Sequence, residues 1–212
     1  MAHFASSPRP VHSIWGSIIM AEEFLPGFWV VTTASHGGIM LSASRQAAMP
    51  EALQLDTANY EEDCDWALPV LAFRDEFEAA QPDRASWLEL AVDTARCWHP
   101  DRYEAFTGEA VPENASRVLR RRAAYTAAIG KQCVTAAWGD WADWVPEGRT
   151  GVVACEILAV DHLGNARYGE ERCYALVDKH AYSKRGEVFC LEDNEHELID
   201  MPEEFRPTKR LE

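Results

Sequence analysis

Four carboxylates and one thiol are concentrated between two aromatic residues, Tyr60 and Trp66. Their order along the chain is Glu61, Glu62, Asp63, Cys64 and Asp65. Carboxylates can act as general acids or bases, can supply oxygen ligands to a hard cation, and can attract a cationic partner. A thiolate is a nucleophile and a soft metal ligand. This stretch is therefore the first candidate for a functional site.

A thiol enzyme at Cys64 needs a histidine within reach to act as its base. His36 lies in a glycine-rich turn, where a ligand can approach the backbone closely. An alternative site therefore joins His36 with Cys64, or His36 with a carboxylate of residues 61–65, in a small hydrolase-like enzyme. A helix N-terminus near Cys64 would lower the pKa of the thiol, whereas the flanking acids would raise it. No local signature supports this pairing, so no catalytic residue is assigned.

The sequence lacks the spacings typical of metal and nucleotide sites. Its seven histidines form no His-x-x-x-His pair, its six cysteines form no Cys-x-x-Cys pair, and no Walker-type loop occurs. On a helix, the acids of residues 61–65 would point in different directions and would not converge on one ion. We therefore predict no metal and no cofactor, and we expect the scattered cysteines to be reduced, buried thiols.

The acidic stretch is expected to open a helix. Asn59 is a suitable N-cap for a helix that runs to about Phe73, which places three of the acids in its first turn, where they complement the helix dipole. Pro69 would kink that helix. Before it, the pattern predicts strands at residues 14–21, 28–33 and 39–41, and a short helix that Ser42 or Ser44 caps and that ends at Met49.

Further along the chain, helices give way to strands. Apolar spacing predicts helices over residues 83–98 and from Asn114 or Ser116 to Ile129, and strands over 132–138, 151–160, 166–177 and 187–191. The fold class is therefore α+β, with an N-terminal antiparallel meander, central helices and a C-terminal antiparallel sheet. We expect a flexible N-terminus at 1–12, one domain over 13–205 with a helical middle at about 43–130 and a β-rich part at about 131–192, and a tail at 206–212.

The longest loop, residues 139–150, carries Trp141 and Trp144. Tryptophans near a loop either fill the core or present a binding patch, so these two residues mark a candidate interaction loop. A structural or oligomeric component that dimerises through this loop is a third interpretation of the protein.

Charge is strongly unbalanced and unevenly distributed. The net charge is −15 at pH 7, and acids predominate over residues 51–95 and 187–204. The compact basic cluster of Arg117, Arg120, Arg121 and Arg122 either pairs internally or binds an anion. Because each phosphate contact needs a basic side chain, this balance argues against direct binding of nucleic acid. No apolar run reaches the length of about 18–20 residues that a membrane helix needs, and the N-terminus lacks signal-peptide order, so we expect a cytoplasmic protein with no membrane partner.

Several segments together resemble a known but uncharacterised domain. They are residues 14–16, 25–27, 33–42, 49–50, 60–67, 98–104 and 136–141. They are similar to a domain of unknown function that recurs in accessory proteins of bacterial plasmids and phages, and the resemblance covers most of residues 14–177. No activity is established for that domain, and the resemblance implies the setting of a mobile genetic element.

Charge and setting together predict an acidic protein-binding module. Its expected role is the inhibition of a host defence complex such as a CRISPR effector, by blocking or mimicking nucleic acid. The partner would be a host protein with a basic nucleic-acid-binding surface, and the acidic face would be Glu61, Glu62, Asp63 and Asp65.

Overall fold

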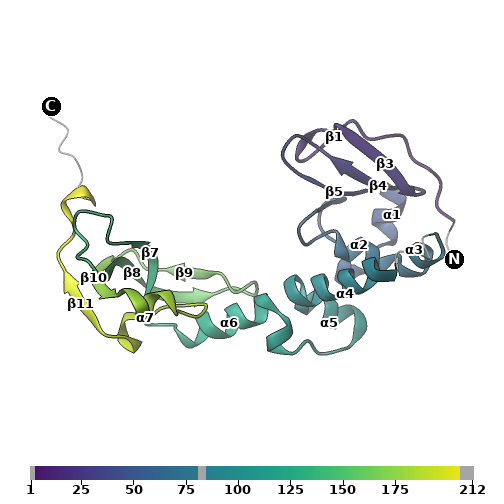
Figure 1. Cartoon of the computed structure of the whole chain (residues 1–212). Coiled ribbons are helices and arrows are strands. Elements are labelled where there is room, and N and C mark those ends of the chain that lie inside the picture. Colours follow the sequence, from purple (N-terminus) through teal and green to yellow (C-terminus); the bar gives the residue numbers. More distant parts are fainter. Residues whose placement is uncertain (1–2, 81–84, 206–212) are drawn as a thin grey trace. The chain divides into compact units, whose positions relative to one another are not determined.

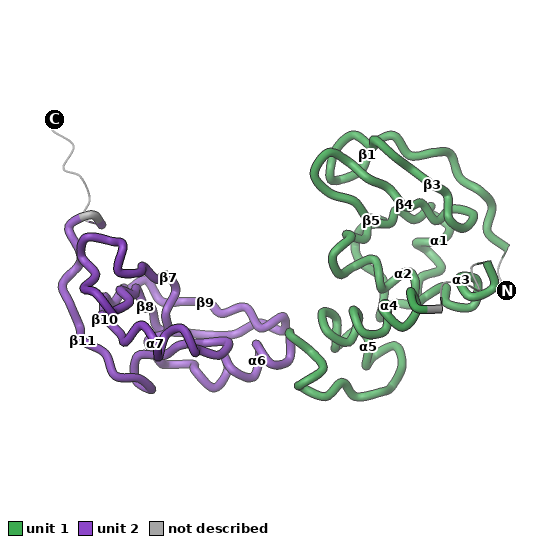
Figure 2. Tube along the Cα trace, in the orientation of Figure 1, with its two compact units in different colours: residues 1–117 green, residues 118–212 purple. Residues whose placement is uncertain are grey.

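The computed structural model describes residues 3–80 and 85–205. Its internal contacts group the chain into two compact units, residues 1–117 and residues 118–212 (Figure 2). The sequence predicts a single domain over residues 13–205 because it shows no repeat, low-complexity tract or obvious linker. In the structure, helix α6 (Arg117–Ala127) begins at the boundary between the two units. The predicted tail, residues 206–212, lies outside the described residues.

Unit 1 contains the predicted antiparallel meander (Figure 1). Its sheet has the order β3-β4-β5-β6, and a separate hairpin pairs β1 with β2. The bounds are β1 (His12–Ser13), β2 (Gly16–Ser17), β3 (Met20–Leu25), β4 (Phe28–Thr32), β5 (Gly37–Leu41) and β6 (Asn59–Glu61). The strand predicted over residues 14–21 is wrong, because Gly16 takes a φ of 118° that reverses the chain there. The apolar residues Ile14 and Ile19 are therefore left exposed.

Tight turns join β3 to β4 and β4 to β5. Gly27 has a φ of 75° in the β3–β4 turn, and its N–H donates to Glu23 Oε1 at 2.7 Å. In the β4–β5 turn, the Thr33 hydroxyl donates to the carbonyl of His36 at 2.8 Å. Side-chain acceptors and donors of this kind stabilise tight turns, and the second turn brings His36 to the end of the sheet.

Helices complete unit 1. They are α1 (Ala43–Ala48), α2 (Ala67–Ala72), α3 (Arg74–Ala80), α4 (Ala85–Trp98) and α5 (Pro100–Thr107), with single 3-10 turns η1 (Glu51–Leu53) and η3 (Glu113–Ala115). Ser42 caps α1, as predicted, by accepting a hydrogen bond from the N–H of Arg45. Helix α4 ends at Trp98, also as predicted, and Pro100 then begins α5, which the sequence pattern did not indicate. The predicted start of α4 at Asp83 lies outside the described residues.

The helix predicted from Asn59 to Phe73 is wrong in its first half. Asn59–Glu61 forms strand β6, and the helix begins only at Ala67. Pairing with β5 places Tyr60 opposite Ile39 and buries the Tyr60 side chain completely, and this burial outweighs the local preference for a helix. Pro69 causes no kink because it is the third residue of α2, where the backbone N–H has no partner inside the helix.

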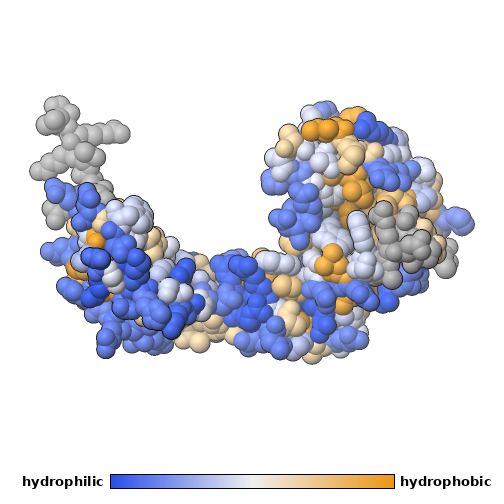
Figure 3. All heavy atoms as spheres, viewed as in Figure 1, coloured by the Kyte–Doolittle hydropathy of each residue, from blue (hydrophilic) through white to orange (hydrophobic). Residues whose placement is uncertain are grey.

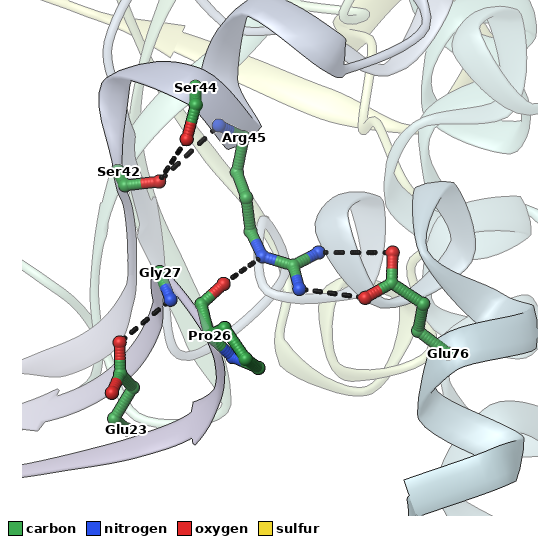
Figure 4. Close-up of polar contacts among 7 residues, drawn as sticks. All are labelled: Glu23, Pro26, Gly27, Ser42, Ser44, Arg45 and Glu76. Atoms are coloured by element: carbon green, nitrogen blue, oxygen red, sulfur yellow. Dashed lines mark hydrogen bonds and ion pairs between the residues drawn. The ribbon is translucent and has the colours of Figure 1, made fainter. Parts of the chain in front are cut away.

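A fully buried arginine joins three elements of unit 1 (Figure 4). Arg45 of α1 donates from Nε to the carbonyl of Pro26 at 2.6 Å and from Nη2 to Glu76 Oε2 in α3 at 2.8 Å. The rings of Phe4 and Phe73 lie 4.2 Å and 4.6 Å from its guanidinium carbon. A buried cation is stable only with such paired and stacked partners.

The first residues of the chain have contacts without regular structure. Residues 3–11 form no helix or strand, but the Phe4 ring packs edge-on against Phe73, and the Ser7 hydroxyl accepts from Trp29 Nε1 at 2.8 Å. The flexibility expected of residues 1–12 stays a prediction.

Unit 2 holds the C-terminal antiparallel sheet and thereby completes the predicted α+β fold. The strand order is β11-β10-β8-β7, and β9 pairs with the far end of β8. The elements after α6 are β7 (Gln132–Trp138), β8 (Arg149–Val160), β9 (Ala166–Tyr168), β10 (Cys173–Asp178), α7 (Lys179–Ser183), η4 (Leu191–Asp193), β11 (His196–Ile199) and η5 (Glu203–Phe205). The central strand β8 is buried along most of its length.

Two of the strands predicted for unit 2 are wrong. The strand predicted over 166–177 is interrupted by the exposed residues 170–172, so β9 and β10 are separate. Residues 187–191 form no strand, although Cys190 makes an isolated bridge with Cys133, and the edge strand is β11 instead. Strand β11 has only four residues, of which three are exposed, so its sequence lacks the buried apolar run that marks the other strands.

Candidate functional site at the acidic turn

The acidic stretch forms a tight turn, residues 62–66, between β6 and α2. Its first anchor is Tyr60, whose buried hydroxyl donates to Gln46 Oε1 at 2.9 Å. Burial raises the pKa of this phenol. The turn is closed by the N–H of Trp66, which donates to the carbonyl of Glu61 at 2.9 Å, and by the N–H of Asp63, which donates to Glu61 Oε2 at 2.8 Å. The backbone therefore fixes the directions of the acids.

The four acids do not share one environment. Glu62 and Asp63 are exposed, whereas Glu61 and Asp65 are half-buried. Glu61 closes the turn, and Asp65 Oδ1 lies 3.1 Å from Nε2 of His99, at the junction of α4 and α5. Two of the four predicted residues of the acidic face therefore point into solvent, and the other two hold the local structure.

Cys64, Asp65 and His99 form a first cluster. Their ligand-type atoms, Sγ, a carboxylate oxygen and an imidazole nitrogen, all lie within 4.8 Å of one another. The Cys64 thiol is 3.8 Å from Asp65 Oδ1. Sequence reasoning missed His99 because no motif links it to residues 64 and 65; only the packing of α2 against α4 brings these segments together.

The environment of Cys64 disfavours the thiolate. Burial, followed by the negative charges of Asp65 and Glu61, raises the pKa of the thiol to about 12. The lowering expected from a helix N-terminus is wrong, because α2 begins three residues later and its N-cap is Trp66. At neutral pH the group is therefore a thiol and a poor nucleophile.

His36, Glu61 and Glu62 form a second cluster, again with ligand-type atoms within 4.8 Å of one another. The Glu62 carboxylate lies over Gly37, where an added Cβ would stand 2.5 Å from Oε2. Among the described residues, His36 groups with these carboxylates and Cys64 groups with Asp65 and His99. Of the two pairings predicted for His36, the structure places the carboxylates Glu61 and Glu62 close to it, and a catalytic role for this group stays a prediction.

An apolar groove of about 350 Å³ adjoins Glu62 in unit 1. It runs between strands β4 and β5 and helix α4, and Val31, Ile39, Trp66, Trp87 and Leu90 contribute to its lining. Trp87 is 40% exposed and Leu90 is 55% exposed. Hydrophobic residues also appear over the sheet on the visible face of unit 1, whereas the visible face of unit 2 is mainly hydrophilic (Figure 3). Exposed large apolar side chains beside a groove are typical of a binding surface.

The predicted interaction loop of unit 2 is divided between surface and core. Trp141 is 76% exposed, whereas Trp144 is half-buried with its ring centre 5.8 Å from that of Trp138 and 5.9 Å from that of Phe205. A role in binding or dimerisation stays a prediction, and Trp141 is the residue available for it.

The four arginines near the start of α6 have partners within the chain. Arg117 stacks on Trp98 and Arg121 stacks on Tyr125, with distances of 5.3 Å and 5.4 Å from the guanidinium carbon to the ring centre. Arg120 Nε lies 3.8 Å from Glu187 Oε1, and Arg122 donates to the carbonyl of His162. Internal pairing therefore accounts for a cluster that the sequence left open to anion binding.

Comparison with known proteins gives a family and no activity. Neither the curated proteins nor the solved structures contain a match to this chain. No helix in the described part of the chain is both long enough and apolar enough to cross a membrane. Residues 8–129, more than half of the chain, match a family described as a domain of unknown function (DUF7007), and this match includes all of the acidic turn, the groove and α6. The chain therefore belongs to this uncharacterised family, DUF7007.

Proposed function

We propose that the acidic turn and the adjoining groove form a protein-binding face. The observation that supports this proposal is the position of exposed Glu62 at the rim of a groove that exposes Trp87 and Leu90. Asp63, which is also exposed, follows Glu62 in the turn. Apolar anchors supply most of the affinity at an interface, and charges at the rim guide approach and orientation.

The chemistry of the face defines its partner. A surface with an apolar groove and acidic rim fits a basic surface from which an apolar side chain projects. The net charge of −15 strengthens the attraction to such a partner at a distance. A host protein that binds nucleic acid has a basic surface, and occupation of that surface by this protein would exclude the nucleic acid.

The biological setting is part of the same proposal. Resemblance to accessory proteins of plasmids and phages supports an origin in a mobile genetic element, and a cytoplasmic inhibitor of a host defence complex, such as a CRISPR effector, fits that origin. In this mechanism the acidic side chains mimic the negative charge of nucleic acid. The groove adds apolar contacts with the partner.

The protein is first used to capture a nucleic-acid-targeting complex from the host. The affinity of the protein for the purified complex is then measured. In the Glu62→Lys/Asp63→Lys double variant, association should be slower and should lose much of its dependence on salt. Leu90→Ser should weaken binding by about tenfold, which corresponds to about 1.4 kcal/mol. Leu90 is chosen over Trp87 because the Trp87 ring also packs against Phe24 and Phe77.

Matched controls are exposed residues outside the groove. Asp56→Lys and Glu113→Lys make the same change of charge in unit 1, and Leu158→Ser removes a leucine of unit 2 that is 41% exposed. These variants should bind as the unchanged protein does. Unchanged capture by both the charge variant and the Leu90 variant would contradict the proposal.

A second candidate function rests on the cluster of His36, Glu61 and Glu62. A histidine within 4.8 Å of two carboxylates could act as a general base in a small hydrolase-like enzyme. In that case, hydrolysis of model esters by the purified protein should be lost in His36→Ala and strongly reduced in Glu62→Gln. If both variants hydrolysed the ester at the rate of the unchanged protein, this function would be excluded. Cys64→Ser is the control and should keep the full rate, because the Cys64 thiol is protonated at neutral pH and is not expected to take part.

A further inference from the structure

Three side chains with different metal-binding chemistry converge in unit 1 from two distant segments. Cys64 and Asp65 belong to the acidic turn, and His99 lies between α4 and α5, more than thirty residues later. All three are half-buried, with exposed side-chain fractions of 26% for Asp65 and 13% for His99. The cluster is therefore largely sheltered from solvent.

Two of the three distances between these atoms are close to those of tetrahedral coordination, and the third, from Cys64 Sγ to His99 Nε2, is below 4.8 Å. With zinc–sulfur bonds of about 2.3 Å and zinc–oxygen or zinc–nitrogen bonds of about 2.0–2.2 Å, neighbouring ligand atoms in a tetrahedron lie about 3.3–3.6 Å apart. The distance from Cys64 Sγ to Asp65 Oδ1 is 3.8 Å, and the distance from Asp65 Oδ1 to His99 Nε2 is 3.1 Å. A few tenths of an ångström of movement would bring both distances into that range.

A second observation also points to a ligand. Nε2 of His99 is buried and makes no hydrogen bond to any residue in the described part of the chain. Asp65 Oδ1 is close enough to form one, but it lies outside the direction of a hydrogen bond from the ring nitrogen. Buried polar atoms of proteins nearly always have a partner, and coordination to a metal ion would supply one here.

We propose that Cys64, Asp65 and His99 bind one Zn²⁺ ion through Sγ, Oδ1 and Nε2. A set of one sulfur, one nitrogen and one oxygen ligand suits zinc, whereas Mg²⁺ and Ca²⁺ prefer oxygen ligands alone. Binding replaces the proton of the Cys64 thiol with the metal and releases that proton to solvent. Three protein ligands leave a fourth position for water.

The ion would link the acidic turn to the junction of α4 and α5. Such a link fixes the turn that carries Glu62 and Asp63, but metal binding by these three side chains does not depend on any partner protein. The zinc site and the protein-binding face are therefore tested separately.

The test uses the full-length protein without a histidine tag, after removal of metal with a chelator. Titration with Zn²⁺ against a chromophoric chelator should show one equivalent of tight binding. Co²⁺ in place of Zn²⁺ should give a near-ultraviolet charge-transfer band from a cobalt–thiolate bond. Cys64→Ser should abolish that band. Asp65→Asn and His99→Gln should each weaken Zn²⁺ binding by at least about tenfold, because changes to residues that only contact the ligands of a metal already reduce affinity by this much.

Two matched variants define the specificity of the result. Cys97→Ser removes another half-buried cysteine of unit 1, and His36→Ala removes the histidine of the second cluster. Both should bind one equivalent of Zn²⁺ and keep the cobalt–thiolate band, with circular dichroism showing that every variant is folded. The proposal is overturned if the folded protein binds no equivalent of Zn²⁺, if the band persists in Cys64→Ser, or if only Cys97→Ser loses it.

Discussion

At Cys64, burial and neighbouring negative charge act in the same direction, and they raise the pKa of the thiol to about 12. We predict that Cys64 in the metal-free protein reacts with a thiol reagent at pH 7.5 more slowly than a cysteine in an unstructured peptide, because the thiolate is the reactive form. The rate is measured on the labelled peptide by mass spectrometry.

Asp65→Asn provides the control for this prediction. It removes the charge that contributes most after burial, so the labelling of Cys64 should become faster. A thiol that reacts in the unchanged protein as fast as the free peptide would contradict the assignment and would return Cys64 to the candidate nucleophiles.

The turn between β3 and β4 gives a prediction about pH. Glu23 accepts hydrogen bonds from the N–H groups of Gly27 and Ser7, and these bonds lower the pKa of its carboxyl from the usual 4.5. A lowered pKa in the folded state contributes stability above pH 4.5, and this contribution is lost as pH falls through the lowered value. We therefore expect the thermal unfolding temperature to fall below pH 4.5, and to fall less steeply in Glu23→Gln.

Glu22→Gln is the comparison for that measurement, because Glu22 is an exposed neighbour on the same strand. Its acid limb should follow that of the unchanged protein. If Glu23→Gln and Glu22→Gln gave the same profile, the hydrogen bonds to Glu23 would have no part in acid stability.

Between elements, Arg45 connects α1, the β3–β4 turn and α3. Its side chain has no exposed surface, whereas Glu76 is 27% exposed. Removal of one partner from a buried ion pair typically costs about 3–5 kcal/mol, because the other charge is left without compensation. We predict that Glu76→Ala lowers the free energy of unfolding of unit 1 by an amount at the lower end of this range, measured by denaturant titration.

Arg74 and Glu78 offer a matched pair in the same helix. They are separated by 2.9 Å, but both side chains are about half exposed. Glu78→Ala should therefore lower the free energy of unfolding by only about 0.3–0.5 kcal/mol. Equal losses for Glu76→Ala and Glu78→Ala would show that burial of Arg45 does not control the stability of this region.

The loop between β7 and β8 contrasts two tryptophans. Trp144 packs with Trp138 and Phe205, so Trp144→Ala should lower the free energy of unfolding of unit 2. The loss should be roughly 3 kcal/mol or less, because a fully buried ring costs at least about 3 kcal/mol and Trp144 is only half-buried. Trp141→Ala should leave stability unchanged because Trp141 is 76% exposed. If the protein dimerises through this loop, sizing should show that Trp141→Ala is monomeric; an unchanged oligomeric state would remove the loop from the interface.

At the scale of the whole molecule, the net charge of −15 and the internal partners of the arginines both predict that the protein does not bind nucleic acid directly. The protein should not retard DNA or RNA in a gel at physiological salt, because its net negative charge repels phosphates and the arginines of α6 already have partners within the chain. Retardation that weakens with salt and disappears in Arg121→Glu would contradict this prediction and would indicate an anion site on α6.

The sequence by itself determined the α+β class, the meander, the capped helix after Ser42 and the strands β7 and β8. Each of these depends on local signals that a short segment contains, such as the spacing of apolar residues, a helix cap or a glycine at a turn. It also identified the acidic stretch as unusual. Local signals failed at Asn59, where a suitable helix cap is in fact part of a strand.

Only the tertiary structure decided the conformation and the neighbours of the acidic stretch. Pairing of β6 with β5 buried Tyr60 and turned the expected first helical turn into a tight loop, because burial of a large side chain outweighs capping. Packing of α2 against α4 then brought His99 to Cys64 and Asp65. Contacts between residues distant in the chain leave no spacing to recognise in a single sequence, and for that reason both the proposed zinc site and the division of the four acids between solvent and structure emerged only from the fold.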